Sequence, residues 1–291
     1  MQSRNDLALF PKNSPTPFLL PTLVGAAIAV AIPVLTLGWL SLVQWDLISP
    51  VRWAGLDNFG RVLSDAAFLQ SLGISFYISI WATLLQLAIG TLAGYLQWTK
   101  ASRLVSGIYL LPWFAAPVAI GVIWKWLLTP ETGILSKLLG TRLDILTSGS
   151  LAPLAVASVS AWLGFGYTAM FVAAGLRSIP TDTIEAAKLD GASGRQIFWG
   201  VQLPQLGTLA LFLVVTTSLQ TMGLFDIVYV LTGGGPLGAT DTAALHIANS
   251  ALYQFDVGGS AASAVAFTAL EVIVFLVQVL VYRRLTRRYR A

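Results

Sequence analysis

The sequence predicts an all-α, polytopic membrane protein with six transmembrane helices, and three observations lead to this prediction. Of the 291 residues, 56% are hydrophobic and 10% are charged, and the mean hydropathy is +0.76. Because an average soluble domain carries about 25% charged residues, this chain cannot cover a water-facing surface. Six apolar segments are long enough to cross a bilayer, and the Lys and Arg residues between them are unevenly distributed. The composition excludes a soluble globular protein, a disordered chain and a nucleic-acid-binding protein.

The hydrocarbon core of a bilayer is about 30 Å thick and requires roughly 20 apolar residues in helical conformation. Six segments meet this requirement: 18–43, 72–98, 104–128, 151–177, 205–231 and 260–282. The first follows basic residues and contains Ala27-Ile28-Ala29, which resembles a signal-peptide cleavage site. Its apolar run continues to Val43, which is too long for a signal peptide, so we expect a retained helix. The chain is expected to form one membrane domain, 18–282, between an N-terminal tail, 1–17, and a basic tail, 283–291.

Lys and Arg residues near the spans set the orientation, because they are enriched on the cytoplasmic side. With six spans, both termini lie on the same side. Of the 17 Lys and Arg residues, 12 fall on that side, and the other five are Arg52, Arg61, Lys125, Lys137 and Arg142. We therefore expect both termini in the cytoplasm and the segments 44–71, 129–150 and 232–259 outside.

The residues that support catalysis or metal binding are scarce. The sequence has no cysteine and a single histidine, His246, so it offers neither thiolate ligands nor a histidine cluster for a metal. None of its lysines follows a glycine, which excludes the phosphate-binding loop of a Walker A motif. We expect no catalytic residue, no metal site and no cofactor, and any ATP hydrolysis linked to this protein must occur in another subunit.

The cytoplasmic segment 178–204 has the pattern of two short helices that meet at a glycine. Thr181-Asp182 provides N-cap chemistry for the first helix, and Gly191 stands where a helix ends in a left-handed residue. Ser193 to Gln196 has the pattern of a capping box for a second helix, which is expected to stop before Pro204. The pattern alone fits an ordinary hairpin between two spans as well as it fits a docking element.

Glu185-Ala186-Ala187, followed by Asp190-Gly191-Ala192 and by Leu203-Pro204, resembles the EAA loop in permease subunits of binding-protein-dependent ABC importers. Other stretches are similar to the sugar-transporting class, within it to the subunit related to the maltose and glycerol-3-phosphate permeases: Phe18 to Pro21, Ser41 to Asp46, Gly55 to Phe59 and Phe225 to Pro236. The resemblance covers nearly the whole chain. The sequence departs from the family at Gln205-Leu206-Gly207, where a second proline often follows Leu-Pro, so the exit from the second short helix stays open.

The resemblance implies a type I ABC importer permease in the inner or plasma membrane of a bacterium or archaeon, in contact with membrane lipid. It also implies the partners: a second permease subunit, forming a heterodimer; two copies of a cytoplasmic ATPase; an extracytoplasmic solute-binding protein; and a carbohydrate or sugar derivative as substrate. The EAA helix would fit a cleft in the ATPase. The expected coupling residues are Glu185, Ala186, Ala187, Asp190, Gly191 and Pro204.

Polar side chains inside spans are costly and usually face the interior of a bundle or a wet cavity. On that ground we expect Gln86, Trp162, Thr216 and Gln220 in the substrate pathway, because amides, hydroxyls and aromatic faces suit a sugar. The same side chains can instead hold neighbouring helices together. Glu271, near the middle of the sixth span, is expected to be protonated or to face a partner subunit.

A secondary transporter or channel that works without an ATPase is the alternative. Such a protein would be expected to show inverted repeats, broken helices or a set of paired charges in the membrane. Only Glu271 favours this alternative, and the EAA loop argues against it.

Overall fold

The structure is a computed structural model that describes residues 16–99 and 103–288. Within these residues, four helices are long and apolar enough to cross a membrane: α1 (Thr16–Leu40), α3 (Ala66–Thr99), α7 (Leu151–Arg177) and α14 (Val257–Arg288). They coincide with the first, second, fourth and sixth expected spans. α1 ends three residues earlier than expected, because the chain turns at Ser41 and Leu42 into a short strand.

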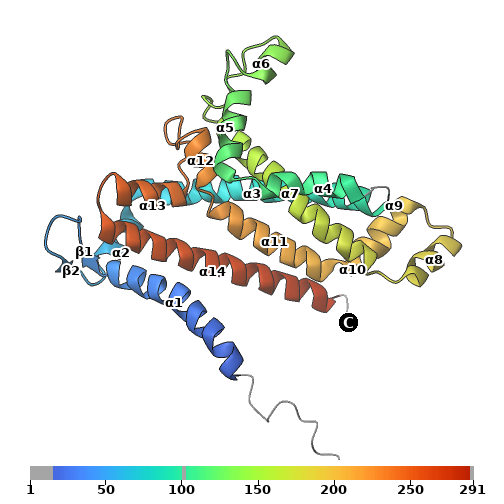
Figure 1. Cartoon of the computed structure of the whole chain (residues 1–291), viewed down its shortest axis with the longest axis horizontal. Helices are drawn as coiled ribbons and strands as arrows, with labels where there is room; N and C mark the ends of the chain where they lie inside the picture. Colours follow the sequence, from blue (N-terminus) through green and yellow to red (C-terminus); the bar gives the residue numbers. More distant parts are fainter. Residues whose placement is uncertain (1–15, 100–102, 289–291) are drawn as a thin grey trace, which may run out of the picture.

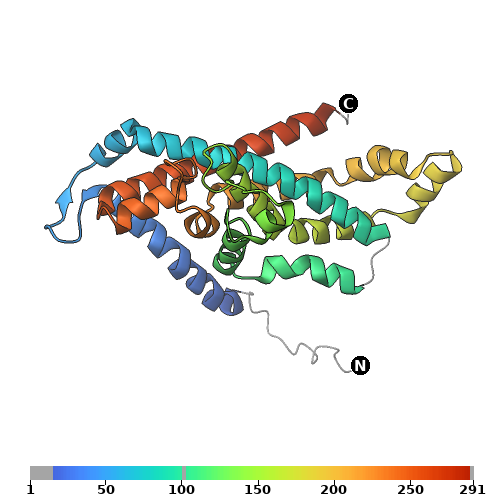
Figure 2. The same ribbon diagram turned by 90° about the horizontal axis from the view of Figure 1, so that it is seen from above.

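The centre of the molecule is the pair formed by α3 and α7, which lie against each other along the long axis (Figure 1). Small residues allow this close packing, because a Cβ atom on Gly94 of α3 would lie only 2.7 Å from the carbonyl oxygen of Ala169. The apolar part of α7 is 61% buried within the chain, against 0% for α1 and 6% for α14. α1 diverges from the body, as Figure 2 shows. The outer two helices therefore keep most of their apolar surface available for lipid or for other subunits.

The third expected span, 104–128, is not one straight helix. It consists of α4 (Arg103–Phe114) and α5 (Pro117–Leu127), which meet at an angle of 99°. Pro117 has no N–H to continue the helical hydrogen bonds, and it restricts the residue before it to extended conformations. Ala116 accordingly adopts φ −63° and ψ 126°. The expectation of a continuous helix here was wrong.

The fifth expected span, 205–231, is also interrupted. Its helical part is α11 (Gly207–Met222), and after Gly223 the chain starts a separate short helix, α12 (Asp226–Leu231). Before α11 lie α9 (Gly194–Ile197), a π-helical turn η1 (Phe198–Gln202) and α10 (Leu203–Gln205), and this stretch is bent by 72° from α11.

The sequence led us to expect that the second short helix of segment 178–204 stops before Pro204. In the structure it continues past this residue. The chain stays helical through Gln205, and Pro204 follows the π-helical turn η1 after one residue. The bend falls at Leu206, immediately before Gly207 and inside the stretch where the sequence departs from the family pattern.

The connections at one end of the long axis are held together by polar contacts. Strands β1 (Val43–Gln44) and β2 (Arg52–Trp53) pair antiparallel, with Val43 opposite Trp53, and α2 (Asp57–Ser64) follows. The fully buried Asn58 donates through Nδ2 to the carbonyl oxygens of Ser41 and Val43, at 3.0 and 2.8 Å. Arg61 binds Asp256 with two hydrogen bonds, of 2.6 and 3.1 Å, and so ties α2 to the start of α14.

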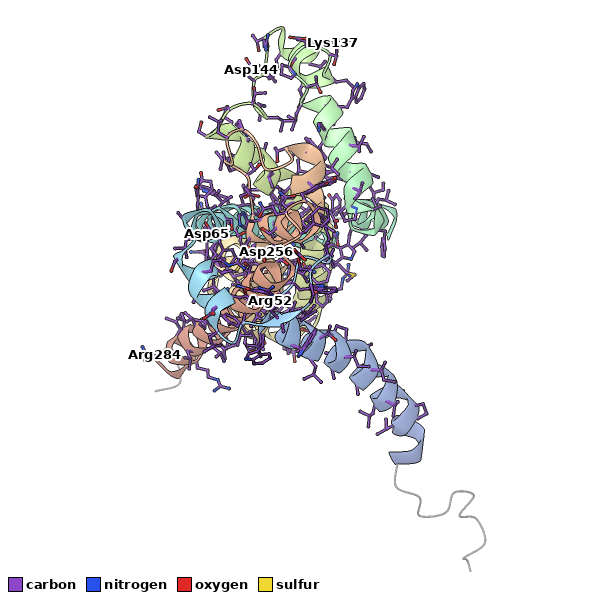
Figure 3. The ribbon with its side chains drawn as sticks, turned by 90° about the vertical axis from the view of Figure 1, so that its left-hand side faces the viewer. Arg52, Asp65, Lys137, Asp144, Asp256 and Arg284 are labelled. Carbon is purple, nitrogen blue, oxygen red and sulfur yellow. The ribbon has the colours of Figure 1, made fainter. Side chains whose placement is uncertain are left out.

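Three further helices complete the chain. α6 (Ile134–Leu139) extends α5 into an arm that projects from the body, and Figure 3 shows Lys137 and Asp144 at its tip. α13 (Ala243–Leu252) lies against α14 near the end that carries β1 and β2. α8 (Thr181–Leu189) lies with α9 at the opposite end, toward which the N-terminal end of α1 and the C-terminal end of α14 also point (Figure 1).

Candidate functional site

A cavity of about 350 Å³ lies where the two interrupted spans meet. Trp113 and Pro117 flank the break between α4 and α5, and Gly223 to Asp226 form the break after α11; all of them line the cavity. Interrupted helices leave backbone N–H and C=O groups without helical partners, and at membrane depth this is tolerated only where the backbone is buried in protein or lines a water-filled space. Two breaks at one cavity therefore indicate a wet space inside the helix bundle.

The lining carries polar side chains, and none of those described is basic. It combines two amides, two hydroxyls, two aromatic rings and one carboxylate with small and aliphatic side chains. The lining residues described by the structure are Gln86, Trp113, Pro117, Ser160, Leu163, Gly164, Gln220, Thr221, Gly223, Leu224, Phe225, Asp226 and Ile227. Such a surface can bind a molecule rich in hydroxyl groups through neutral hydrogen bonds.

Gln86 joins three helices at one edge of this cavity. Its Nε2 atom lies 3.1 Å from the carbonyl oxygen of Gly164, 3.2 Å from Oγ1 of Thr168 and 3.4 Å from Oγ1 of Thr217. A Cβ atom on Gly164 would collide with the Gln86 amide, so the glycine makes room for this contact. With 3% of its surface exposed, Gln86 holds α3, α7 and α11 together more than it faces the open cavity.

The other three expected pathway residues lie in different surroundings. Gln220 is exposed and lines the cavity from α11. Thr216, one turn earlier, donates its hydroxyl to the carbonyl oxygen of Phe212 at 2.8 Å and does not line the cavity. Trp162 packs edge-on against Trp124, with ring centroids 5.6 Å apart, and also lies outside the lining. The cavity thus brings together Gln86 and Gln220 of the expected set.

The sequence analysis missed Trp113 and Asp226. Both lie within four residues of a helix break, Trp113 beside Pro112 and Pro117 and Asp226 after Gly223. Proline or glycine inside an apolar segment was the available signal, but it was not sufficient, because Pro21, Pro33 and Pro112 lie inside unbroken helices.

A second feature lies at the end of the molecule that carries α8 and α9. Segment 178–204, which we call the coupling element, turns between its helices at Gly191, where φ is +81°. The N–H of Gly191 donates to the carbonyl oxygen of Lys188 and that of Ala192 to the carbonyl oxygen of Ala187, both at 3.0 Å. This is the Schellman arrangement, which satisfies the free carbonyl groups at a helix end and usually uses glycine at the left-handed position.

The two helix starts in this element differ from each other. The expected capping box at α9 is present, and the Ser193 N–H donates to Oε1 of Gln196 at 2.8 Å. The expected Thr181-Asp182 cap on α8 is wrong, because Pro180 occupies the N-cap position without a side-chain cap and α8 already begins at Thr181.

The inner face of the coupling element is anchored in the helix bundle. Ile184 and Ile197 are buried in one apolar cluster with Leu176 of α7 and Leu213 of α11. Phe198 packs edge-on against Tyr95 of α3, with centroids 4.7 Å apart. The element is therefore attached to α3, α7 and α11, three of the helices that line the cavity.

The outer face of α8 is exposed and mixed in character. Glu185, Ala186 and Asp190 are exposed, as is the left-handed Gly191, whereas Ala187 is half-buried against the apolar cluster. Leu189, which the sequence analysis did not single out, is 88% exposed between these carboxylates. Pro204 lies apart from α8, in α10 just before the bend.

Comparison with known proteins assigns the chain, with its cavity and its 178–204 element, to a protein family. Residues 86–287 match the family described as binding-protein-dependent transport system inner membrane component. The chain belongs to this family. The membership confirms the resemblance drawn from the EAA loop and decides against the alternative of a secondary transporter or channel.

Two relatives in this transport family are similar over most of their length. The chain is 34% identical over 247 residues to the sn-glycerol-3-phosphate transport system permease protein UgpA of Agrobacterium fabrum, covering 81% of this chain and 82% of that protein. It is 31% identical over 278 residues to the probable ABC transporter permease protein YurN of Bacillus subtilis, covering 92% and 95%.

A solved structure of another transporter has the same fold as this chain. A bacterial ABC transporter involved in the import of the acidic polysaccharide alginate matches with a TM-score of 0.79 at 20% identity, covering 93% of this chain and 95% of the other. The match confirms the predicted type I permease fold.

Proposed function

We propose that this protein forms half of the translocation path of an ATP-driven importer for a carbohydrate or sugar derivative. The observation that carries the proposal is the physical link between the coupling element and the cavity, because both are built on α3, α7 and α11. The chain supplies the path and the docking element, and a separate ATPase supplies the energy.

The coupling step follows from how the element is anchored. An ATPase that binds the outer face of α8 pushes on Glu185, Ala186 and Leu189, and the buried Ile184 and Ile197 pass the displacement to α7 and α11. Tightly packed apolar contacts transmit such displacement because the interior has little free volume to absorb it. Movement of α7 against α11 then changes the shape of the cavity between them.

The remaining partners follow from the uncovered surfaces. A second permease subunit, completing a heterodimer, would cover the part of α14 that carries Glu271. A second cavity, of about 450 Å³ between α11 and α14, is lined by Gln220 and Glu271, and a carboxylate facing lipid at this depth would cost roughly 3 kcal/mol. Two copies of the ATPase would serve the two permease subunits, and an extracytoplasmic solute-binding protein would deliver substrate at the end that carries β1, β2 and α13.

The carbohydrate class is supported by the cavity and by similar proteins. Neutral amides and hydroxyls beside two aromatic rings suit a molecule that has both hydroxyl groups and apolar C–H faces. The relative UgpA is named for sn-glycerol-3-phosphate, and the structurally similar transporter is involved in the import of the acidic polysaccharide alginate.

The site of action is the inner or plasma membrane of a prokaryote, with both termini in the cytoplasm.

The docking role is tested by placing a charge on the outer face of α8. Leu189→Glu should prevent co-purification of the ATPase and abolish ATP-driven sugar uptake in proteoliposomes. Leu138→Glu is the matched control, because Leu138 is 76% exposed on the projecting arm and should tolerate the same change. Normal ATPase binding by Leu189→Glu, or sugar uptake in the absence of ATP, would contradict the proposal.

A further inference from the structure

Four aromatic rings form a continuous row along the helix bundle: Trp113, Tyr167, Phe171 and Phe212. Trp113 of α4 stacks on Tyr167 of α7, with centroids 4.6 Å apart and ring planes at 23°. Tyr167 lies 4.7 Å from Phe171, and Phe171 lies 5.4 Å from Phe212 of α11.

The row connects the cavity with the coupling element. Trp113 lines the cavity, whereas Tyr167 and Phe171 pack against the apolar cluster that anchors the coupling element. On α7, Tyr167 and Phe171 follow the cavity residues Ser160 and Gly164 at helical spacings of three and four, which places all of them on one helix face.

α11 has the same sequence of features, but its chain runs toward the cavity where that of α7 runs away from it. On α11, Phe212 stands two turns before the cavity residue Gln220, with Thr216 between them at spacings of four. One continuous surface therefore runs from the cavity toward the coupling element along both helices.

The rings of the row keep part of their surface open. Phe212 is 42% exposed and the other three are half-buried, in contrast to Phe68, which is 1% exposed and serves as core packing. Partly exposed aromatic rings beside a cavity offer contact surfaces to a ring-shaped solute that has an apolar face.

The charges along this surface favour a neutral saccharide over a phosphorylated one. Phosphate groups are bound in proteins mainly by Arg and Lys side chains. Among the described residues that line the cavity or form the row, Asp226 is the one charged side chain, and its carboxylate repels a phosphate. None of the side chains described in this lining compensates the charge of a phosphoester, although relatives such as UgpA are named for sn-glycerol-3-phosphate.

We infer that this permease carries an uncharged saccharide, whose sugar rings pass from the cavity along the aromatic row, and that it does not carry a phosphoester. The inference rests on the proposed import of a carbohydrate and narrows its class. Neutral hydrogen bonds to the exposed amide of Gln220 hold the hydroxyl groups in the cavity, and the rings of the row then receive the apolar faces of the sugar.

The test uses the complete importer in proteoliposomes, with its ATPase, second permease subunit and binding protein. ATP-driven uptake is measured for labelled glucose, maltose and trehalose and for sn-glycerol-3-phosphate and glucose 6-phosphate. Tyr167→Leu and Phe171→Leu remove a flat ring, whereas Tyr167→Phe and Phe171→Tyr keep it. Tyr77→Leu is the control, because Tyr77 is a 45% exposed ring of α3 that pairs with Trp81 outside the row.

We expect uptake of at least one neutral saccharide and of neither phosphoester. Each leucine variant should lower that uptake about twofold to tenfold, the range that corresponds to one lost aromatic contact, while co-purification with the ATPase stays normal. The ring-preserving variants and Tyr77→Leu should transport like the wild type.

Two kinds of result would overturn the inference while leaving carbohydrate import intact. One is uptake of a phosphoester by the wild type. The other is equal behaviour of the leucine and ring-preserving variants, either both normal or both defective, because the row would then serve packing alone. Failure of the ATP-hydrolysing complex to take up any of the five compounds would instead overturn the proposed carbohydrate import itself.

Discussion

Two glutamines that line the cavity differ in burial and in hydrogen bonding. Gln86 is buried and connects three helices, whereas Gln220 is exposed on α11. Removing the amide should therefore affect folding at one position and transport at the other.

We predict that Gln220→Leu lowers transport or changes sugar preference, because the cavity loses a hydrogen-bonding group while no helix contact is broken. Assembly and ATP hydrolysis without substrate should persist. Uptake kinetics in proteoliposomes measure the change, and failure of the complex to assemble would show that Gln220 holds helices together.

For Gln86→Leu we expect the reverse result. The carbonyl group of Gly164 and the hydroxyl of Thr168 lose a partner, which should destabilise the protein by roughly 1 kcal/mol, as is typical of hydrogen bonds between membrane helices. A lower midpoint of thermal unfolding in detergent would show this, and an unchanged midpoint with impaired uptake would place Gln86 in the pathway instead.

His246 provides a pH-dependent contact outside the spans. Its Nδ1 atom lies 3.1 Å from Oδ2 of Asp241, and this hydrogen bond raises the pKa of His246 above its ordinary value of 6.5, against the opposing effect of burial. The charges of Asp241 and Asp65 act in the same direction as the hydrogen bond. A raised pKa in the folded state means that protonation of the histidine stabilises the fold.

The stabilisation should be complete below pH 6.5 and should disappear as the pH rises through the raised pKa. We predict that wild type exceeds His246→Asn in thermal midpoint at pH 5.5, and that the difference shrinks by pH 8.5. A difference that is independent of pH between these values would show that the contact stabilises through packing alone.

At the scale of elements, the coupling element depends on a backbone conformation that side chains rarely adopt. We predict that Gly191→Val, which must adopt φ +81° with a β-branched side chain, misplaces α8 while the protein still inserts in the membrane. ATPase association or substrate-stimulated ATP hydrolysis should be lost. Gly194→Ala is the control, because that glycine has open space around its Cβ position and no positive φ.

Transport at the wild-type rate by a complex carrying Gly191→Val would show that the corner is dispensable. A defect of equal size in Gly194→Ala would show that the element tolerates no added side chain, whatever its backbone conformation.

Elements whose signals are local were predictable from the sequence. The glycine corner and the Ser193 capping box involve residues within five positions of each other, so composition and spacing are sufficient to identify them. The apolar run of α7 was long and uninterrupted, and the structure has the same bounds, Leu151–Arg177.

The two helix breaks could not be placed from hydropathy. Proline does not decide the matter, because α1 contains Pro21 and Pro33, and α4 contains Pro112, without a break at these positions, whereas Pro117 begins a new helix. Whether a freed backbone group is satisfied depends on neighbouring helices and water, which are tertiary features. Trp113 and Asp226 were missed for the same reason, since their position in the cavity follows from the breaks.

At the scale of the whole molecule, the ends of α1 and α14 that lead to the termini point in the same direction as the coupling element. We predict that reporter fusions after Lys12, Gly140, Ser193 and Arg290 lie inside, outside, inside and inside. The basis is the distribution of Lys and Arg along the chain. An external position for Ser193 would contradict the proposed docking of the ATPase.

The meeting of two interrupted helices at one cavity has a consequence for how this protein can diversify. Each break is a feature of the main chain: α5 starts at Pro117 after the extended Ala116, and α11 ends before Gly223, three residues before α12 begins at Asp226. The breaks that frame the cavity therefore do not depend on side chains such as Gln220, which line it from within a regular helix. Point mutations of those side chains can retune cargo preference gradually, while the scaffold that admits a hydrated solute stays in place.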